Sequence, residues 1–203
     1  MDEFRYILGL ILIVIMPMVI TFWLVIHLGA RLWRKRKPIF AYCVAGACIG
    51  IVVTICILTR NMLLGMDFGT NWFLFTIGAF IYATSWLLWR PVKRHLDFKT
   101  FAGVPEITND PIALITDGPF ALVRHPRYLM VLIGIAGWCL MSNYSGAYLM
   151  GLVSFFGLLL IIKLEERDLV MRFGDQYRAY QHQVPPLLPN WIGLKKLAAG
   201  EKP

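Results

Sequence analysis

The sequence predicts an all-α, polytopic membrane protein with about five transmembrane helices. Hydrophobic residues make up 58% of the 203 residues and charged residues only 16%, with a mean hydropathy of +0.64. Soluble chains average about 45–50% apolar and about 25% charged residues. The apolar residues also stand in blocks of roughly 18–22, the length that crosses a ~30 Å hydrocarbon layer. These observations exclude an ordinary soluble domain.

The first three blocks predict three spans in the N-terminal part of the chain, residues 1–89. The first span covers residues 7–28 and contains Pro17, which a membrane helix tolerates because its neighbours satisfy the freed backbone groups. A basic cluster follows, and then a second span at residues 39–58. A short loop leads to the third span, residues 72–89, which has tryptophans at both ends, as is typical of a membrane interface.

The second part, residues 90–203, opens with a long polar stretch, residues 90–127, whose five prolines predict short helical turns. Two shorter apolar segments follow, residues 128–141 and 147–164, joined by the turn sequence at 142–146. They are tilted spans or a hairpin that does not fully cross. In either case the antiparallel pair returns residues 165–166 to the side of residues 124–128.

Beyond the last apolar segment the residues at helical spacing form one amphipathic stripe. This stripe predicts a helix that emerges from the bilayer at the two glutamates, continues as an interfacial helix and ends before Pro185 and Pro186. The stripe consists of Glu166, Val170, Phe173, Tyr177 and Tyr180.

The net charge of +8 follows the loops. All Lys and Arg except Arg5 and Arg60 fall on one side of the predicted membrane, so the positive-inside rule places the N-terminus outside and the C-terminus inside. The same rule explains the basic balance without nucleic acid. The four cysteines lie inside apolar segments and form no CxxC pair, so we expect neither a disulfide framework nor a metal site.

Two charged clusters are candidates for chemistry. Glu165 and Glu166 stand at the membrane edge, where a solvated helix exit is the plain alternative. Arg124, His125 and Tyr128 stand at the start of the fourth apolar segment, where a cytoplasmic flank is the plain alternative. Together on one cytoplasmic face they suit a zwitterionic ligand that carries a nucleobase.

Two motifs resemble those of a known family. Residues 116–128 read TDGPFALVRHPRY and resemble a T-x-G-P-Y-x-x-V-R-H-P-x-Y signature. Residues 165–180 follow the pattern E-E-x-x-L-x-x-x-F-G-x-x-Y-x-x-Y, with Val184 and Pro185 shortly after. The chain therefore resembles the isoprenylcysteine carboxyl methyltransferase-like family, which shares its C-terminal half with phospholipid N-methyltransferases.

The resemblance implies an integral membrane methyltransferase that uses S-adenosylmethionine, with the cofactor site formed by the cytoplasmic loop and the C-terminal interfacial helix. The positive-inside rule places this site on the cytoplasmic face of a bacterial inner membrane or an endoplasmic reticulum. The implied cofactor-binding residues are Ile112, Ala113, Leu114, Ile115, Phe120, His125, Pro126, Arg127, Tyr128, Glu165 and Glu166. The implied catalytic residues are Glu166, His125 and Arg124, with Glu166 or His125 as the base for an amine acceptor.

The acceptor stays open among a prenylated cysteine carboxylate, a phospholipid amine and another small apolar molecule. Three positions depart from the family pattern. Phe120 replaces the more usual Tyr, Ile161 stands where prenylcysteine enzymes have a substrate-contacting Arg, and Met130 stands where many relatives have Gly.

Two other functions compete with a methyltransferase. A non-enzymatic subunit or carrier would bind no cofactor, and carriers usually show an internal repeat and midplane charges that this sequence lacks. A reductase related to the sterol reductases would bind a nicotinamide cofactor, although those enzymes have more spans.

Overall fold

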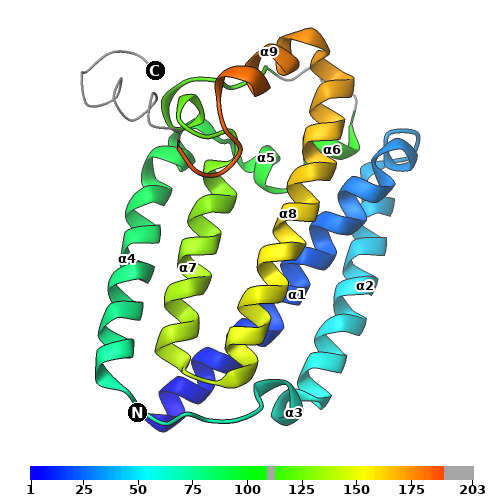
Figure 1. Ribbon diagram of the computed structural model, residues 1–203. Helices are drawn as coiled ribbons and strands as arrows, with labels where there is room; N and C mark the ends of the chain where they lie inside the picture. The colour runs from blue at the N-terminus through cyan, green and yellow to red at the C-terminus, as the bar shows by residue number, and fades with distance from the viewer. Residues whose placement is uncertain (109–112, 190–203) are drawn as a thin grey trace, which may run out of the picture.

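The structure is a computed structural model that describes residues 1–108 and 113–189. Within these residues the chain is helical apart from turns and one isolated bridge between Asp67 and Tyr144. The long helices stand side by side, and the short ones gather at the two ends of the bundle (Figure 1). The elements are α1 (Asp2–Trp33), α2 (Pro38–Leu58), α3 (Arg60–Leu64), α4 (Trp72–His95), α5 (Phe98–Phe101), α6 (Val104–Ile107), η1 (Gly118–Ala121), α7 (Pro126–Ser142), α8 (Ser145–Phe173) and α9 (Asp175–Gln183).

Four of the helices, α1, α2, α4 and α8, are long and apolar enough to cross a membrane. The fifth, α7, has only 17 residues, about 26 Å at 1.5 Å per residue, which is shorter than a typical span. It nevertheless runs antiparallel beside α4 as part of the same bundle (Figure 1). The predicted all-helical class is confirmed, and four of the five predicted spans meet the length criterion.

The third predicted span ends too early at residue 89, because α4 continues to His95. The prediction followed hydropathy, which falls at Arg90, but the change from apolar to charged residues marks the edge of the apolar surface and not the end of the helix. Pro91 lies inside this last turn and a half. In the described residues that follow, 96–108 and 113–125, the polar stretch contains the short helices α5, α6 and η1, as predicted.

The single interfacial helix predicted before Pro185 is wrong, because the helix breaks at Gly174. Gly174 has φ +53° and ψ −126°, a conformation that residues with a Cβ rarely adopt. The chain therefore turns, and α9 folds over the end of the bundle instead of continuing α8 (Figure 1). Glu165 and Glu166 lie in α8, about two turns before its end.

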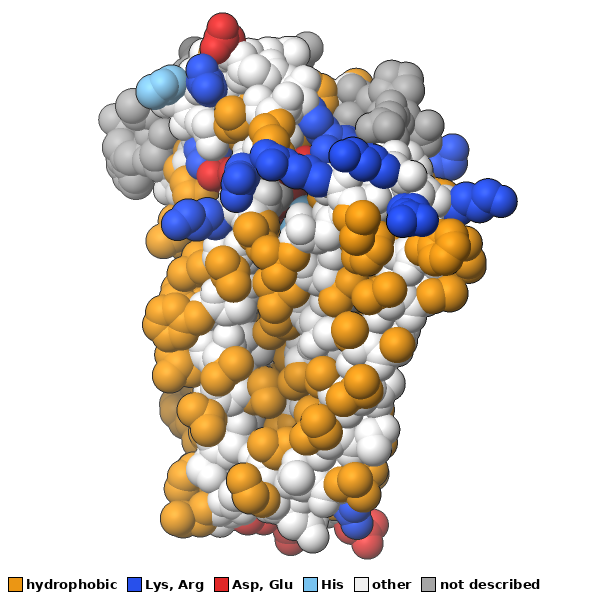
Figure 2. Space-filling view, turned by 90° about the vertical axis from the view of Figure 1, so that its right-hand side faces the viewer, with side chains coloured by type: hydrophobic (Ala, Val, Ile, Leu, Met, Phe, Trp, Pro, Cys, Tyr) orange, Lys and Arg blue, Asp and Glu red, His pale blue; other side chains and the backbone are white. Residues whose placement is uncertain are grey.

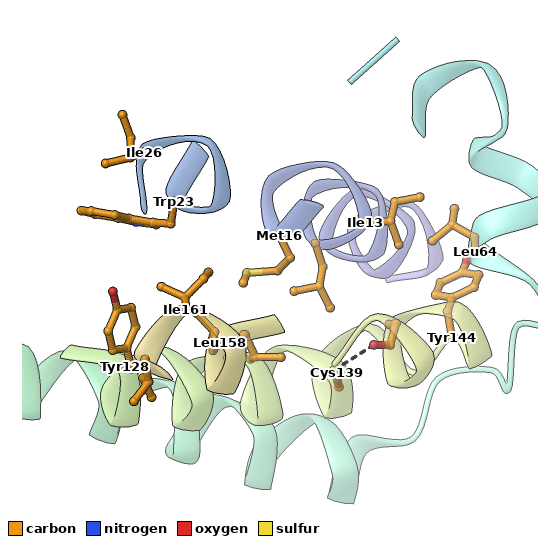
Figure 3. Close-up of a cluster of buried hydrophobic side chains, with 14 of the residues drawn as sticks. Ile13, Met16, Trp23, Ile26, Leu64, Tyr128, Cys139, Tyr144, Leu158 and Ile161 are labelled. Carbon is orange, nitrogen blue, oxygen red and sulfur yellow. Dashed lines mark hydrogen bonds between the residues drawn. The ribbon is translucent and has the colours of Figure 1, made fainter. Parts of the chain in front are cut away.

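The buried core lies between α1 and the pair α7 and α8. Trp23, Ile161 and Tyr128 lie together at one end of this cluster, and Ile13, Leu64 and Tyr144 lie at the other (Figure 3). All of them are buried or nearly so. Burial of this kind fixes α8 against α1 and so fixes the height of the two glutamates.

The outer surface is apolar along the helices. Large side chains such as Leu58, Phe73 and Phe80 are more than 70% exposed, as is expected for a lipid-facing surface. Lys and Arg side chains form a band directly beyond this apolar surface (Figure 2). We call the end of the bundle that carries this band, α9, α5 and α6 the basic end.

The opposite end of the bundle is held by a buried arginine. Arg5 is only 1% exposed and forms ion pairs with Asp2, at 2.9 Å, and with Asp67. Its guanidinium also lies 5.3 Å from the centre of the Tyr144 ring. Charge pairing and the cation–π contact thus connect α1, the loop before α4 and the turn between α7 and α8.

Candidate functional site

The two motif segments meet at the basic end, where the chain before α7 pairs with the chain after α9. The backbone N–H groups of Arg124 and His125 donate to the carbonyl oxygens of Pro185 and Pro186, both at 2.9 Å. His125 directly precedes α7, and Pro126 occupies the first turn of α7, where no backbone N–H is needed. The spacing of the motif therefore places Arg124 and His125 just before α7, facing the end of α8.

Glu166 joins three segments through its carboxylate. Arg124 donates to its Oε1 through Nε at 2.8 Å, and His125 Nε2 lies 3.1 Å from the same oxygen. The Gln181 amide donates to Oε2 at 3.3 Å. Because an ionised carboxylate only accepts hydrogen bonds, Nε2 of His125 carries the proton, which leaves Nδ1 as the ring's acceptor.

Glu165, the neighbouring carboxylate, has its own partners. The Tyr128 hydroxyl donates to Glu165 Oε2 at 2.6 Å, and an Arg127 nitrogen lies 3.8 Å from the same oxygen. Arg127 also donates to the Tyr128 hydroxyl at 2.8 Å and stacks over Trp23 at 4.6 Å. Glu165 is thus positioned by Tyr128 of α7 and by Arg127, which itself packs against Trp23 of α1.

A cavity of about 130 Å³ opens among these segments. It is walled by the chain before α7, by α6, by the end of α8 and by α9. Its lining residues are Thr100, Pro105, Glu106, Ala113, Leu114, Ile115, Phe120, Arg124, His125, Glu165, Leu169, Phe173, Tyr177 and Tyr180.

Most of the residues expected to bind a cofactor lie at this cavity. Ala113, Leu114, Ile115, Phe120, His125 and Glu165 line it, as does the candidate catalytic residue Arg124. Pro126, Arg127, Tyr128 and Glu166 are not among the lining residues, and the last three reach it through the hydrogen bonds and ion pairs given above. Ile112 lies outside the residues that the structure describes.

Glu106 is a lining residue that the sequence did not indicate. Burial, followed by the neighbouring charge of Glu165, raises the pKa of Glu106 from 4.5 to about 7. Its Oε2 is buried and has no hydrogen-bond partner in the described part of the chain. A buried carboxyl with an unused oxygen in a cavity is a candidate ligand-binding group. No local signal marks it, since it stands as one polar residue in the apolar turn Val104–Ile107.

Two tyrosines of α9 complete the wall. The Tyr180 hydroxyl donates to the carbonyl oxygen of Phe120, and the Tyr177 hydroxyl is buried without a partner among the described residues. Burial raises the pKa of both phenols above the ordinary value, so both are neutral donors at physiological pH. Their place in the amphipathic stripe, which predicted an interfacial helix, was a signal for them, although neither was named as a site residue.

A second, apolar groove of about 290 Å³ runs along α4, α7 and α1. Four of its ten lining residues are aromatic, and the lining includes Met130, one of the positions that departs from the family pattern. The lining residues are Met16, Tyr82, Ser85, Trp86, Trp89, Met130, Val131, Gly134, Ile135 and Trp138.

The arrangement is suited to a ligand that has charged and apolar parts. Carboxylates suit a cation, an aromatic ring and apolar side chains suit a flat heterocycle, and tyrosine hydroxyls can donate hydrogen bonds to acceptors on a ligand. Within residues 1–108 and 113–189, no three His, Cys, Asp or Glu side chains gather closely enough to hold a metal ion.

The fold and the site together define a multi-pass integral membrane protein with a charged cavity at one end of its helices. The chain belongs to the phospholipid methyltransferase family, whose profile matches residues 72–176. That range runs from the start of α4 into α9 and contains nearly all of the described cavity lining.

Curated relatives match a similar region. The chain is 40% identical over 80 residues to a protein-S-isoprenylcysteine O-methyltransferase of Schizosaccharomyces pombe, covering 37% of this chain and 34% of the relative. It is 33% identical over 94 residues to methanethiol S-methyltransferase 1 of Bradyrhizobium diazoefficiens, covering 43% and 32%. It is 39% identical over 71 residues to a methanethiol S-methyltransferase of Pseudomonas deceptionensis, covering 35% and 26%.

The matched stretch thus spans about a third or less of the length of these relatives. No solved structure matches the chain.

Proposed function

We propose that the protein is an S-adenosylmethionine-dependent methyltransferase that methylates a lipophilic acceptor. The observation that carries the proposal is the cavity at the basic end. It combines the segment before α7, the motif residues Arg124 and His125, and Glu165 of α8, which lie far apart in the sequence. Family membership supports the same activity.

The residues at the cavity fit the cofactor in kind. Glu165 and Glu106 provide negative charge or hydrogen-bond acceptors for the cationic methionine part, and Phe120 and Leu114 provide an apolar wall for the adenine ring. When bound, S-adenosylmethionine supplies a methyl group on a positively charged sulfur. The role of these residues is to bind and orient it, since positioning contributes most to such a displacement.

The cavity is smaller than the cofactor site that this proposal requires. Its volume of about 130 Å³ is below the roughly 300–1,000 Å³ of small-molecule pockets. Binding therefore requires the lining side chains to move apart. The buried, unpartnered oxygens of Glu106 and Tyr177 favour that opening, because a ligand would supply the hydrogen bonds that they lack.

His125 and Glu166 can act together as a proton acceptor. Glu166 fixes the ring of His125 through Nε2 and stabilises the charged imidazolium, and Nδ1 remains to accept the proton. An amine acceptor needs this step because it must lose a proton, whereas an anionic acceptor does not. In this proposal Arg124 orients Glu166 through their ion pair.

The acceptor reaches the site along the apolar groove on α4 and α7. The groove has a volume of about 290 Å³ and an apolar lining. A molecule the size of methanethiol would fill only part of it, so a larger apolar group is the better fit. The positive-inside rule places the basic end, and hence the cofactor cavity, in the cytosol.

Cofactor binding tests the proposal directly. We expect Glu165→Ala and His125→Ala to weaken binding of S-adenosylhomocysteine by about 100-fold or more, because losing one member of a buried charge pair costs about 3–5 kcal/mol. Calorimetry on detergent-purified protein measures this. Asp175→Ala and His182→Ala, at exposed positions of α9, are matched controls and should bind normally.

Undiminished binding by the two site variants, or no binding by the unchanged protein, would contradict the proposal.

The acceptor class is tested by incubating membranes with radiolabelled cofactor. We expect label in the lipid extract; label only in soluble protein or in a volatile product would contradict the lipophilic acceptor.

A further inference from the structure

A polar groove of about 200 Å³ lies at the basic end on a different side of α8 from the cofactor cavity. It is formed by the last turns of α1 and the facing surface of α8, whereas Glu165, Leu169 and Phe173 line the cofactor cavity. The lining residues of the groove are His27, Leu28, Ala30, Arg31, Leu164, Arg167, Asp168 and Met171.

The groove carries two arginines that are available for a ligand. Both Arg31 and Arg167 are exposed. The only hydrogen-bond partner that Arg31 has in the described chain is the Met171 sulfur, a weak acceptor at 3.5 Å, and Arg167 has none there. Two guanidinium groups without an anionic partner on one groove form a site for an anion.

The one acid in the groove does not neutralise these arginines. The Asp168 carboxylate accepts from Arg34 at 2.6 Å and forms an ion pair with Arg172 at 3.1 Å. Neither arginine lines the groove, so the charge of Asp168 is already balanced from outside it. The groove therefore keeps a net positive charge.

His27 forms part of the groove wall and also lacks a partner. It is 8% exposed, stacks on Trp23 with ring centres 5.5 Å apart, and neither ring nitrogen has a hydrogen-bond partner in the described residues. A buried imidazole without partners is costly, and a bound oxyanion would satisfy one of its nitrogens.

The surroundings indicate where the anion comes from. The groove contains Arg31 and Arg167 at the basic end. At that end the band of Lys and Arg side chains borders the apolar surface directly (Figure 2). Leu28 is 71% exposed and Leu160 of α8 is 48% exposed. A free phosphate would leave this apolar surface unused, whereas the acyl chains of a lipid would cover it.

We propose that this groove binds the phosphate group of an anionic membrane phospholipid, with Arg31 and Arg167 on the phosphate, His27 beside it, and the acyl chains along α1 and α8. The site is separate from the cofactor cavity and does not depend on the proposed function. Because α1 and α8 also position Glu165, a lipid held here stabilises the helix pair that carries the cofactor site.

Native mass spectrometry of the detergent-purified protein tests this proposal, with phosphatidylglycerol, phosphatidylcholine and inorganic phosphate as probes. We expect a phosphatidylglycerol adduct that binds at least tenfold more tightly than the other two. The double variant Arg31→Ala/Arg167→Ala should lose at least tenfold in this affinity. The matched control Lys35→Ala/Arg36→Ala removes two neighbouring exposed charges of the same band and should retain it.

Each contrary result has a definite meaning. Equal losses in both double variants would show a non-specific basic surface and overturn the site. Equal affinity for inorganic phosphate would overturn the lipid source, and equal affinity for phosphatidylcholine would overturn the preference for an anionic lipid. Circular dichroism of each variant tests whether it is folded. A further variant, His27→Leu, should weaken binding of phosphatidylglycerol without changing the surface charge.

Discussion

At the scale of single residues, the cavity shows how far a sequence motif identifies a site. The motif indicated His125 and Glu165 because their neighbours in the sequence form a recognisable pattern. Glu106 lies in the same cavity without such a pattern, because its environment is made by residues distant in the chain. A carboxyl that acquires its chemistry only through burial cannot be found from its neighbours in the sequence.

Glu106 should make stability depend on pH. Its folded pKa of about 7 lies above its ordinary value of 4.5, so the folded protein holds a proton that the unfolded chain releases. Stability should therefore be highest below pH 4.5 for this group and fall as the pH rises through 7. This difference between the two pKa values lowers the free energy of unfolding by about 3 kcal/mol at high pH.

Glu106→Gln removes this ionisation. We expect the variant to be more stable than the unchanged protein at pH 8, by up to about 3 kcal/mol, and equally stable near pH 4.5. Thermal unfolding in detergent across this range measures the difference. For Asp175→Asn, at an exposed carboxyl, the curve of stability against pH should run parallel to that of the unchanged protein. A parallel curve for Glu106→Gln would contradict the raised pKa of Glu106.

At the scale of elements, hydropathy predicted the helices well and their ends less well. The helices α1, α2 and α4 were predicted because each contains an apolar block long enough to cross the lipid. The turn between α7 and α8 was predicted from its polar residues. The end of α4 was missed because a helix continues past the membrane edge. The break at Gly174 was missed because the periodic stripe continues across it, and only the backbone conformation distinguishes two helices from one.

Gly174 should determine the direction of α9. Gly174→Ala meets no neighbouring atom within 4 Å, so its cost is conformational: roughly 1–3 kcal/mol for a Cβ at φ +53°. We expect lower stability and about tenfold weaker S-adenosylhomocysteine binding, because α9 carries Tyr177 and Tyr180. Gly50→Ala in α2, which also meets nothing within 4 Å, should cost nothing, so equal behaviour of the two variants would contradict this account.

The apolar groove between α4 and α7 should control the acceptor and not the cofactor. Val131→Phe fills part of the groove, so we expect the KM for the acceptor to rise about tenfold while S-adenosylhomocysteine binding stays unchanged. Initial rates at saturating cofactor measure this. Val153→Phe on the lipid-facing surface of α8 is the control, and a matching effect there would exclude the groove as the route.

At the scale of the whole molecule, charge predicts the orientation that geometry alone leaves open. On the face that Figure 2 shows, the basic band lies at the end that carries the proposed cofactor cavity. Asp2, next to the N-terminus, and its neighbour Asp67 lie at the other end (Figure 1). Because Lys and Arg prefer the cytoplasmic side, the two ends should face different compartments. Sequence and structure agree on this division because it depends on where charges fall along the chain.

Cysteine labelling tests the orientation. A membrane-impermeant maleimide added to sealed vesicles of known sidedness should label Met66→Cys from outside and Lys35→Cys only after permeabilisation. Both positions are exposed, and the unsubstituted protein controls for the four native cysteines. The reverse pattern would place the cofactor cavity outside and contradict the proposed site.

The pairing of residues 124–125 with residues 185–186 has a consequence for biosynthesis. A ribosome-bound chain that ends at Phe173 already contains the long helices that the structure describes, yet it lacks the carbonyl groups that hold Arg124 and His125 in place. The pocket can therefore assemble only after translation has passed Pro186. Until then the nascent protein is a membrane-inserted bundle that has no finished binding site.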